Sequence, residues 1–370
     1  MNIYGLTQSE LKEQLNDEKS FRVGQIYSWL YKKHCGSFEE MTNLSKDLRV
    51  KLESQFSMDL PEIVTSQLSS DGTRKFLFRL NQGLKNNPSE EVKVETVLIK
   101  QPKRYTLCIS SQYGCAIGCK FCRTATMGLK RNLEVHEIIG QVVAVQREIN
   151  RLVNDDSVID KPAQFHNIVF MGMGEPLHNF ENVNKAIQIL NDTAGSDFSG
   201  RRITLSTSGL VPQIAKFGDS PAKANLAISL NATTNEVREE IMPITKKYPL
   251  EDLLGVLKDF PLKKREKITL EYVMLRGVND TEADLKRLPK LIKNIPAKIN
   301  LIPYNTNSGL GFQSPERVVV DRWLRDLLSK KIVATVRWSK GMDIDAACGQ
   351  LVTAEKTKMI RSSEEINQVV

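Results

Sequence analysis

The sequence predicts an α/β protein whose larger part is a series of βα units. After residue 104, short apolar segments alternate with amphipathic ones, which is the pattern of parallel strands joined by helices. In residues 134–150, for example, Val135, Ile138 and Ile139 fall on one helical face. About six such units in succession form a full or partial barrel, or an open doubly wound sheet. Either architecture places the functional site at the carboxyl ends of the strands.

The N-terminal part of the chain has two other patterns. Residues 1–57 predict a small helical domain, since apolar residues such as Val23, Ile26 and Leu30 recur at helical spacing. Residues 58–103 contain two apolar segments separated by a run rich in Gly, Asn and Pro, which favours paired strands around a loop. We therefore expect a helical domain followed by a strand-rich connector.

The βα series occupies residues 104–351, and each strand is followed by a helix. The predicted strands lie at about 105–110, 167–171, 202–206, 225–230, 267–274, 298–303 and 332–337. The predicted helices lie at about 134–150, 180–191, 234–241, 250–258, 281–292 and 315–329. The polar segment 352–370 is expected to fray as a tail.

Composition and charge limit the class of protein. No apolar stretch is long enough to span a bilayer, and the N-terminus lacks the basic and apolar segments of a secretory signal. We therefore expect a cytoplasmic protein without membrane association. The formal net charge of +8 favours a polyanionic partner, although a solvated basic surface has the same composition.

Three of the six cysteines are close together, at Cys115, Cys119 and Cys122, directly after the first predicted strand of the series. In a reducing compartment this favours metal binding or catalysis over structural disulfides. A zinc site would need a fourth ligand, usually from a second pair, and a thioredoxin-like redox pair would not need Cys115. Three thiolates suit a [4Fe–4S] cluster whose fourth iron stays open to a ligand.

A glycine-rich turn, FMGMGEP at 170–176, ends the second predicted strand. Glycines at such a place let the backbone approach a ligand closely, although most turns of this composition are only turns. The turn follows the cysteine loop by one βα unit. Both should therefore lie at the same end of the sheet.

The cysteine spacing, its position and this turn together resemble the radical S-adenosylmethionine (SAM) superfamily. The resemblance implies a radical SAM partial (βα)6 barrel, with the helical N-terminal domain and a β-hairpin connector attached. It implies that Cys115, Cys119 and Cys122 hold the cluster and that the open iron binds SAM, which is cleaved to a 5′-deoxyadenosyl radical. Gly174 and Glu175 would contact SAM, with the Glu175 carboxylate accepting from its ammonium group.

Four longer segments narrow the resemblance to the RlmN/Cfr family of RNA adenine methyltransferases. They are LCISSQYGCAIGCKFC at 107–122, GLKRNLEVHEIIGQV at 128–142, RRITLSTSGLVP at 201–212 and DIDAACGQL at 343–351. They are more similar to the RlmN branch, which methylates adenine C2, than to the Cfr branch, which methylates C8. The resemblance implies 23S rRNA and the anticodon-adjacent adenine of tRNA as substrates, an RNA-binding N-terminal domain, a reducing electron donor such as flavodoxin, and a monomer.

The same resemblance gives roles to the isolated cysteines. Cys348 matches the cysteine that takes a methyl group from one SAM, while a second SAM supplies the radical that activates this methyl for addition to adenine. Cys108 matches the thiol that resolves the covalent adduct and leaves a Cys108–Cys348 disulfide, and Glu95 matches the proton acceptor. In isolation each cysteine would be interpreted as a small buried apolar residue.

The remaining SAM contacts implied by the family are Ser206, Ser229, Leu230, Asn231 and Asn305. Asn231 stands where the family commonly has histidine, and its amide keeps one donor and one acceptor. Two alternatives stay open: Cfr-type methylation of adenine C8, and a noncatalytic RNA-binding protein stabilised by zinc.

Overall fold

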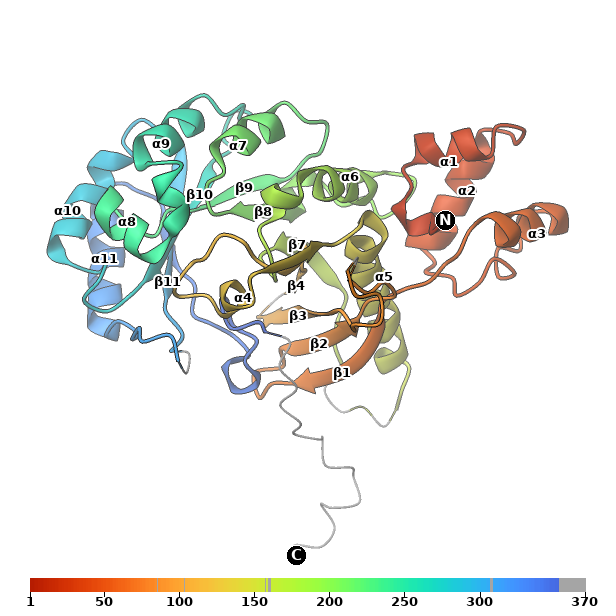
Figure 1. The fold of residues 1–370 in the computed structure, drawn as a ribbon, viewed down its shortest axis with the longest axis horizontal. Helices are drawn as coiled ribbons and strands as arrows, with labels where there is room; N and C mark the ends of the chain where they lie inside the picture. The colour runs from red at the N-terminus through yellow and green to blue at the C-terminus, as the bar shows by residue number, and fades with distance from the viewer. Residues whose placement is uncertain (85, 103, 157, 159–160, 307–308, 353–370) are drawn as a thin grey trace, which may run out of the picture.

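The computed structural model describes residues 1–84, 86–102, 104–156, 158, 161–306 and 309–352 (Figure 1). The chain folds as a helical lobe attached to a curved sheet that is covered on its outer side by helices (Figure 1). The tail predicted at 352–370 lies outside the described residues except for Val352. Among the described residues, none of the helices combines the length and apolar character that crossing a bilayer requires.

The N-terminal lobe contains a 3-10 turn, η1 (Ile3–Gly5), and the helices α1 (Gln8–Gln14), α2 (Phe21–Tyr31) and α3 (Lys46–Gln55). Thr7 begins α1 with a capping box to Glu10, and Ser45 caps α3. The lobe is attached to the barrel helices: Arg147 donates to the Tyr4 hydroxyl at 3.0 Å.

One ten-stranded sheet runs through the rest of the chain in the order β1-β2-β3-β4-β7-β8-β9-β10-β11-β12. The strands β1 (Glu62–Leu68), β2 (Arg74–Arg79), β3 (Lys93–Gln101) and β4 (Arg104–Cys108) pair antiparallel. The strands from β4 onward pair in parallel: β7 (Phe165–Phe170), β8 (Ile203–Thr207), β9 (Asn225–Ser229), β10 (Ile268–Met274), β11 (Ala297–Pro303) and β12 (Ala334–Val336). The predicted connector is therefore an antiparallel extension of the barrel sheet.

Helices connect the parallel strands. They are α5 (Val135–Val153), α6 (Phe180–Asn191), α7 (Val211–Gly218), α8 (Asn235–Ile241), α9 (Leu250–Lys258), α10 (Glu282–Leu291) and α11 (Arg317–Ser329). The apolar face of α5 is buried as predicted, including Val135, Ile138 and Ile139. Six βα connections followed by a last strand, without pairing between β1 and β12, make a partial barrel, which confirms the predicted fold class.

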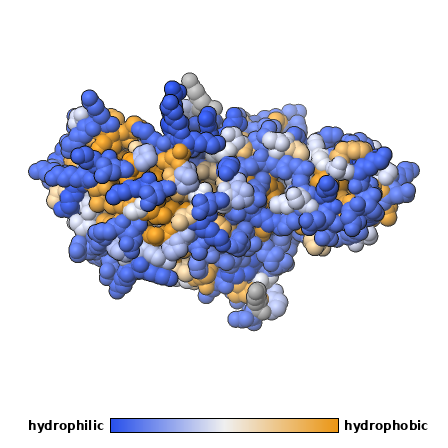
Figure 2. Space-filling model, turned by 90° about the horizontal axis from the view of Figure 1, so that it is seen from above, coloured by the Kyte–Doolittle hydropathy of each residue, from blue (hydrophilic) through white to orange (hydrophobic). Residues whose placement is uncertain are grey.

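Figure 2 shows a mostly hydrophilic face whose largest apolar area lies over the barrel half. The elements that the sequence analysis did not assign are short or half-buried. Strand β1 is a partly exposed edge strand, and α7 has only eight residues. Periodicity is weak over such lengths.

The segment after β12 crosses from the last barrel strand to the β1–β2 turn. It contains η5 (Met342–Ile344), and the Asp343 carboxylate accepts hydrogen bonds from the Ser69 hydroxyl at 2.5 Å and the Ser70 N–H at 2.9 Å. The Gly341 N–H donates to Asp71 Oδ2 at 3.0 Å. These contacts cover the gap between the two edges of the partial barrel and bring Cys348 against its interior.

Candidate active site

The three clustered cysteines lie on a loop at the carboxyl end of β4. A two-stranded hairpin, β5 (Gln112–Gly114) and β6 (Leu129–Asn132), closes the base of this loop, which also contains the short helix α4 (Arg123–Thr126). Gly114 has φ +77°, and a Cβ there would lie 1.8 Å from the Gly128 carbonyl oxygen. Only glycine permits this close crossing of the two strands, so the loop depends on it.

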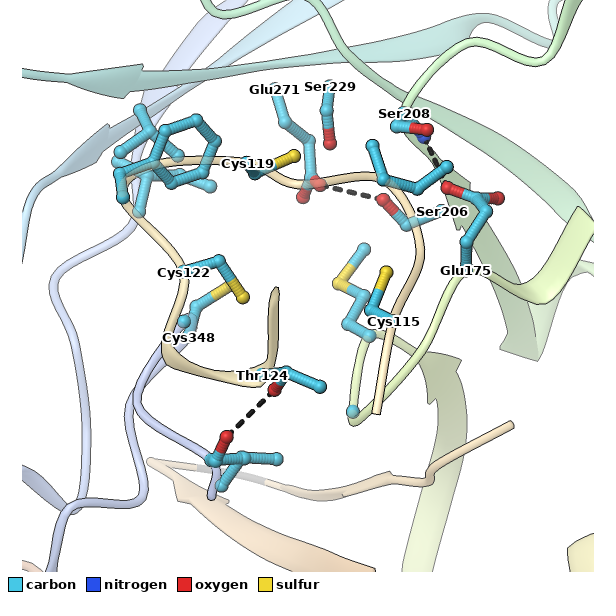
Figure 3. Close-up of a pocket in the computed structure, with 18 of the residues that line it drawn as sticks. Cys115, Cys119, Cys122, Thr124, Glu175, Ser206, Ser208, Ser229, Glu271 and Cys348 are labelled. Atoms are coloured by element: carbon cyan, nitrogen blue, oxygen red, sulfur yellow. Dashed lines mark hydrogen bonds between the residues drawn. The ribbon is translucent and has the colours of Figure 1, made fainter. Parts of the chain in front are cut away.

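All three thiols line one cavity (Figure 3). Burial raises the pKa of Cys115 to about 12 and raises that of Cys119 well above its ordinary value. Among the described residues, no three His, Cys, Asp or Glu side chains converge closely enough to hold a single metal ion. A single tetrahedral zinc would need such convergence, whereas a four-iron cluster spreads its thiolate ligands over separate irons. Three thiols that line one cavity fit the ligand set of such a cluster.

The predicted glycine-rich turn forms the neighbouring wall of the cavity, between β7 and the turn η2 (Pro176–Asn179). Gly174 has φ +98°, and a Cβ there would lie 2.5 Å from Gln112 Cβ. Packing against the β4–β5 segment already explains this glycine, since a side chain would clash with it. The turn therefore fixes the distance between the cysteine loop and Glu175.

Glu175 is buried at the edge of the cavity and accepts two backbone hydrogen bonds. Its Oε2 accepts from the Ser208 N–H at 2.7 Å (Figure 3). Its Oε1 accepts from the Leu177 N–H at 3.0 Å. Burial raises the pKa of Glu175, and these hydrogen bonds oppose the rise by favouring the carboxylate. The arrangement suits a fixed acceptor for a cationic group.

The floor of the cavity contains a carboxylate that the sequence analysis missed. Glu271, on β10, is 5% exposed; its Oε2 accepts from the Ser206 hydroxyl at 2.9 Å, while its Oε1 has no hydrogen-bond partner among the described residues (Figure 3). A buried unpaired carboxylate oxygen is costly, so it is available to a ligand's donor. In the sequence, the only indication of this role was a charged residue within an otherwise largely apolar predicted strand.

Arg238 is a second missed residue, buried beside Cys119. Its guanidinium donates to the carbonyl oxygens of Ser208 at 2.6 Å, Ser229 at 3.1 Å and Leu230 at 3.0 Å. Burial lowers its pKa to about 10, so it stays charged at neutral pH. It fixes the carboxyl ends of β8 and β9 where they meet the cavity. A single arginine in a predicted helix gave no signal for this role.

Cys348 lines the same cavity and lies next to Cys122 (Figure 3). Its loop is bound to the cysteine loop, since the Arg123 N–H donates to the Gly349 carbonyl oxygen at 2.8 Å and the Thr124 hydroxyl donates to that of Leu351 at 2.7 Å. Cys348 is exposed to the cavity but surrounded by protein, and this burial raises its pKa to about 11.

Cys108 ends β4 and is buried, opposite Val97 of β3 and Val169 of β7. Thr106 lines the barrel interior, and strand alternation turns Cys108 to the same side. Burial raises the pKa of Cys108 to about 12, while the Arg337 charge lowers the pKa of both Cys108 and Cys348. Cys108 and Cys348 therefore lie close enough for their charges to interact, at one end of the barrel interior.

Glu95 lies on β3 and is 4% exposed. It forms an ion pair with Lys75 at 2.9 Å and accepts from the Val352 N–H at 2.8 Å. Burial raises its pKa, and Lys75 opposes this rise. Glu95 does not line the cavity, although Leu351, next to its hydrogen-bond partner, does.

The predicted SAM contacts divide into two groups. Ser206, Ser229 and Asn305 line the cavity, while Leu230 and Asn231 do not. Asn231 has φ +56°, and its side chain is used within the protein: Oδ1 accepts from the Val273 N–H at 2.8 Å and Nδ2 contacts the Met242 sulfur at 3.2 Å. Asparagine tolerates this left-handed backbone well.

Comparison with known proteins is consistent with this geometry. Residues 1–58 match the ribosomal RNA large subunit methyltransferase N-terminal domain, and residues 109–288 match the radical SAM superfamily. A crystal structure of a radical SAM methyltransferase from Sphaerobacter thermophilus superimposes with a TM-score of 0.84 at 37% identity, covering 95% of this chain and 99% of that one. It supports the fold over nearly the whole chain.

Curated relatives identify the family. The dual-specificity RNA methyltransferase RlmN of Geotalea uraniireducens is 48% identical over 353 residues, covering 95% of this chain and 96% of the relative. The chain belongs to the RlmN family. RlmN of Jannaschia sp. is 45% identical over 373 residues, which cover 99% of this chain and 92% of that protein. The predicted family is confirmed, and with it the class of radical SAM methyltransferase.

Members of the RlmN family use a [4Fe–4S] cluster and SAM. The residues of this chain fit both groups. Three thiols face one cavity, a glycine turn borders it, and the unpaired Glu271 oxygen lies on its floor. The free space in the cavity is about 140 Å³, and the Cys348 loop, which is bound to the cysteine loop through Thr124, forms part of its wall.

Proposed function

We propose that this protein methylates adenine C2 in 23S rRNA and in the anticodon-adjacent position of tRNA. The observation that supports the proposal most directly is that Cys348 lies in the same cavity as Cys115, Cys119 and Cys122. A methyl-carrying thiol must lie there if its methyl group is to be activated by a radical made at the cluster. The cluster would be held by the three loop cysteines and, with SAM, would supply a 5′-deoxyadenosyl radical.

In this proposal the protein's own groups perform the steps that come before and after the radical reaction. The Cys348 thiolate takes the methyl group of one SAM and presents it to the cavity. After the methyl carbon has joined adenine C2, Glu95 accepts the proton from C2. One electron must also leave the adduct, and it would pass to the cluster. The Cys108 thiolate then attacks Cys348 Sγ: the sulfur–carbon bond breaks, the methylene carbon keeps the electron pair and takes up a proton to become the methyl group, and a Cys108–Cys348 disulfide remains.

SAM contacts are assigned in the same proposal. Gly174, Glu175, Ser206, Ser229 and Asn305 bind it from the cavity wall, and Leu230 and Asn231, which do not line the cavity, are assigned from the family resemblance alone. Residues 1–57 form the RNA-binding domain, 58–103 the connector that carries Glu95, and 104–351 the catalytic barrel.

A reducing donor such as flavodoxin supplies electrons, and the enzyme acts as a monomer. The adenine must leave its stack to reach the cavity.

Nucleoside analysis tests the reaction. Mass spectrometry of 23S rRNA and tRNA from cells with and without the gene should show 2-methyladenosine in both RNAs only when the gene is present. An exclusively 8-methyl product would contradict the C2 assignment in favour of Cfr-type chemistry. One tightly held zinc and no iron, measured anaerobically, would instead support the noncatalytic RNA-binding protein.

A pH profile tests the role of Lys75. Burial raises the pKa of Glu95 and Lys75 opposes the rise, so Lys75→Met should raise this pKa further. A base must be deprotonated, so the acid limb of activity should move to higher pH and turnover at neutral pH should fall by roughly tenfold or more. The control is Lys93→Met on the next strand, whose recorded acidic partner is Glu91 at 2.9 Å. If both variants keep the native profile, Glu95 is not the base.

A further inference from the structure

A second cavity, of about 620 Å³, occupies the barrel interior on the side away from the cysteine loop. Polar side chains at inward-facing strand positions line it, among them Thr106, Asn167, Thr204 and Thr269. Arg104, at the start of β4, and Arg202, just before β8, show that it extends to the amino ends of the strands. It is therefore distinct from the cavity at the carboxyl ends.

We call this second cavity the basic cavity, because its lining is strongly positive. Its charged residues are the six cations Arg104, Arg201, Arg202, Lys298, Arg337 and Lys340, and the single carboxylate Glu271. Lys340 lies 4.0 Å from Asp71. Within the described residues, Arg201, Arg202, Lys298 and Arg337 form no ion pair. Unpaired cations around a concave, partly enclosed space raise the local concentration of anions.

The two cavities meet at Cys348. Met171, Glu271, Ile302 and Cys348 line both of them. Arg337 lies at this junction, where its Nη1 contacts the Met171 sulfur at 3.4 Å. A small molecule in the basic cavity therefore reaches Cys348 without passing through the cavity that the cluster cysteines line.

We propose that the basic cavity is the entrance for an anionic low-molecular-weight thiol that reduces the Cys108–Cys348 disulfide. The inference rests on the proposed function, because only that reaction leaves this disulfide on the protein. An entrance at the amino ends allows reduction while RNA still covers the carboxyl ends. Its volume admits a small molecule but no protein domain.

The chemistry balances with two thiols per disulfide. One thiolate attacks Cys348 Sγ and forms a mixed disulfide, and Cys108 leaves as a thiolate next to the positive charge of Arg337. A second thiolate attacks the sulfur of the bound small thiol, which releases the small-molecule disulfide and the Cys348 thiolate. Two electrons pass from the small thiols to the protein disulfide.

The test compares three thiols of equal chain length and different charge: 2-mercaptoethanesulfonate, 2-mercaptoethanol and cysteamine. The disulfide is formed in the cluster-loaded full chain with diamide and verified by mass spectrometry. Reduction is followed by alkylation of the released thiols, and each rate is divided by the rate of the same thiol with a model disulfide. At low ionic strength the anionic thiol should react roughly five- to tenfold faster than the neutral one, and the cationic thiol more slowly.

Charge reversal locates the entrance. The double variant Arg202→Glu, Lys298→Glu should bring the ratio of the anionic thiol's reduction rate to the neutral thiol's rate to one or below. The control is the double variant Lys12→Glu, Lys46→Glu, which changes the net charge by the same amount but on the N-terminal lobe, and it should preserve this ratio. Circular dichroism checks that both variants fold. A ratio of one in the native protein, or an unchanged ratio in the cavity variant, overturns the inference alone. Failure of diamide to join Cys108 and Cys348 overturns it together with the proposed thiol roles.

Discussion

Cys119→Ala is expected to remove the cluster and lower methylation by at least about a thousandfold while the protein stays folded. Cys119 is the middle cysteine of the loop, lines the cavity, and packs against apolar residues of both core clusters. Three thiolates are the minimum that holds a [4Fe–4S] cluster with one open iron. Two thiolates would leave two irons without protein ligands. Anaerobic iron and sulfide analysis, with absorbance near 400 nm, measures the loss.

Cys35→Ala is the matched control. Cys35 is also a buried cysteine, 1% exposed, but it lies in the N-terminal lobe away from the cavity. It should keep its iron and its activity, with at most a modest loss of thermal stability. A Cys119→Ala protein that retains four irons per chain would contradict the proposed ligand set, and an equal iron loss in Cys35→Ala would indicate a general folding defect.

Much of the fold could be predicted because the βα units are long and strongly periodic. Residues 134–150 were predicted as a helix, and α5 covers Val135–Val153 with its apolar face buried. Strand β1 was missed because only Ile63, Val64 and Leu68 are apolar in it and no residue of it is fully buried. An edge strand needs no continuous apolar pattern, so its sequence carries little signal.

The candidate site was predictable where a local motif fixes the chemistry. The cysteine spacing and the turn at 170–176 are contiguous segments, and both border the cavity. Glu271 and Arg238 were not predictable, because their roles depend on which side of a strand faces inward and on carbonyl groups brought from other elements. Asn231 illustrates a limit of resemblance: its side chain is used in hydrogen bonds within the protein rather than in the cavity.

Cys108→Ala is expected to trap the enzyme on its RNA. Without the Cys108 thiolate, nothing attacks Cys348 Sγ, so the sulfur–carbon bond that joins Cys348 to the adenine methylene persists. Product release should fall below about one methylated adenine per enzyme, a loss of at least about a thousandfold in multiple turnover. A band that contains protein and RNA, stable in denaturing gels and sensitive to ribonuclease, measures the adduct. Mass spectrometry should place the modified nucleotide on the peptide that contains Cys348.

The control that separates trapping from simple inactivation is Cys348→Ala. Both variants lose one thiol from the same pair, but Cys348→Ala has no atom to carry the methyl group, so it should form neither product nor adduct. The double variant should behave like Cys348→Ala, because in the proposed reaction Cys108 acts only after Cys348 has reacted. Normal turnover by Cys108→Ala would show that another thiol or a small reductant resolves the adduct. An adduct in Cys348→Ala would assign the methyl carrier elsewhere.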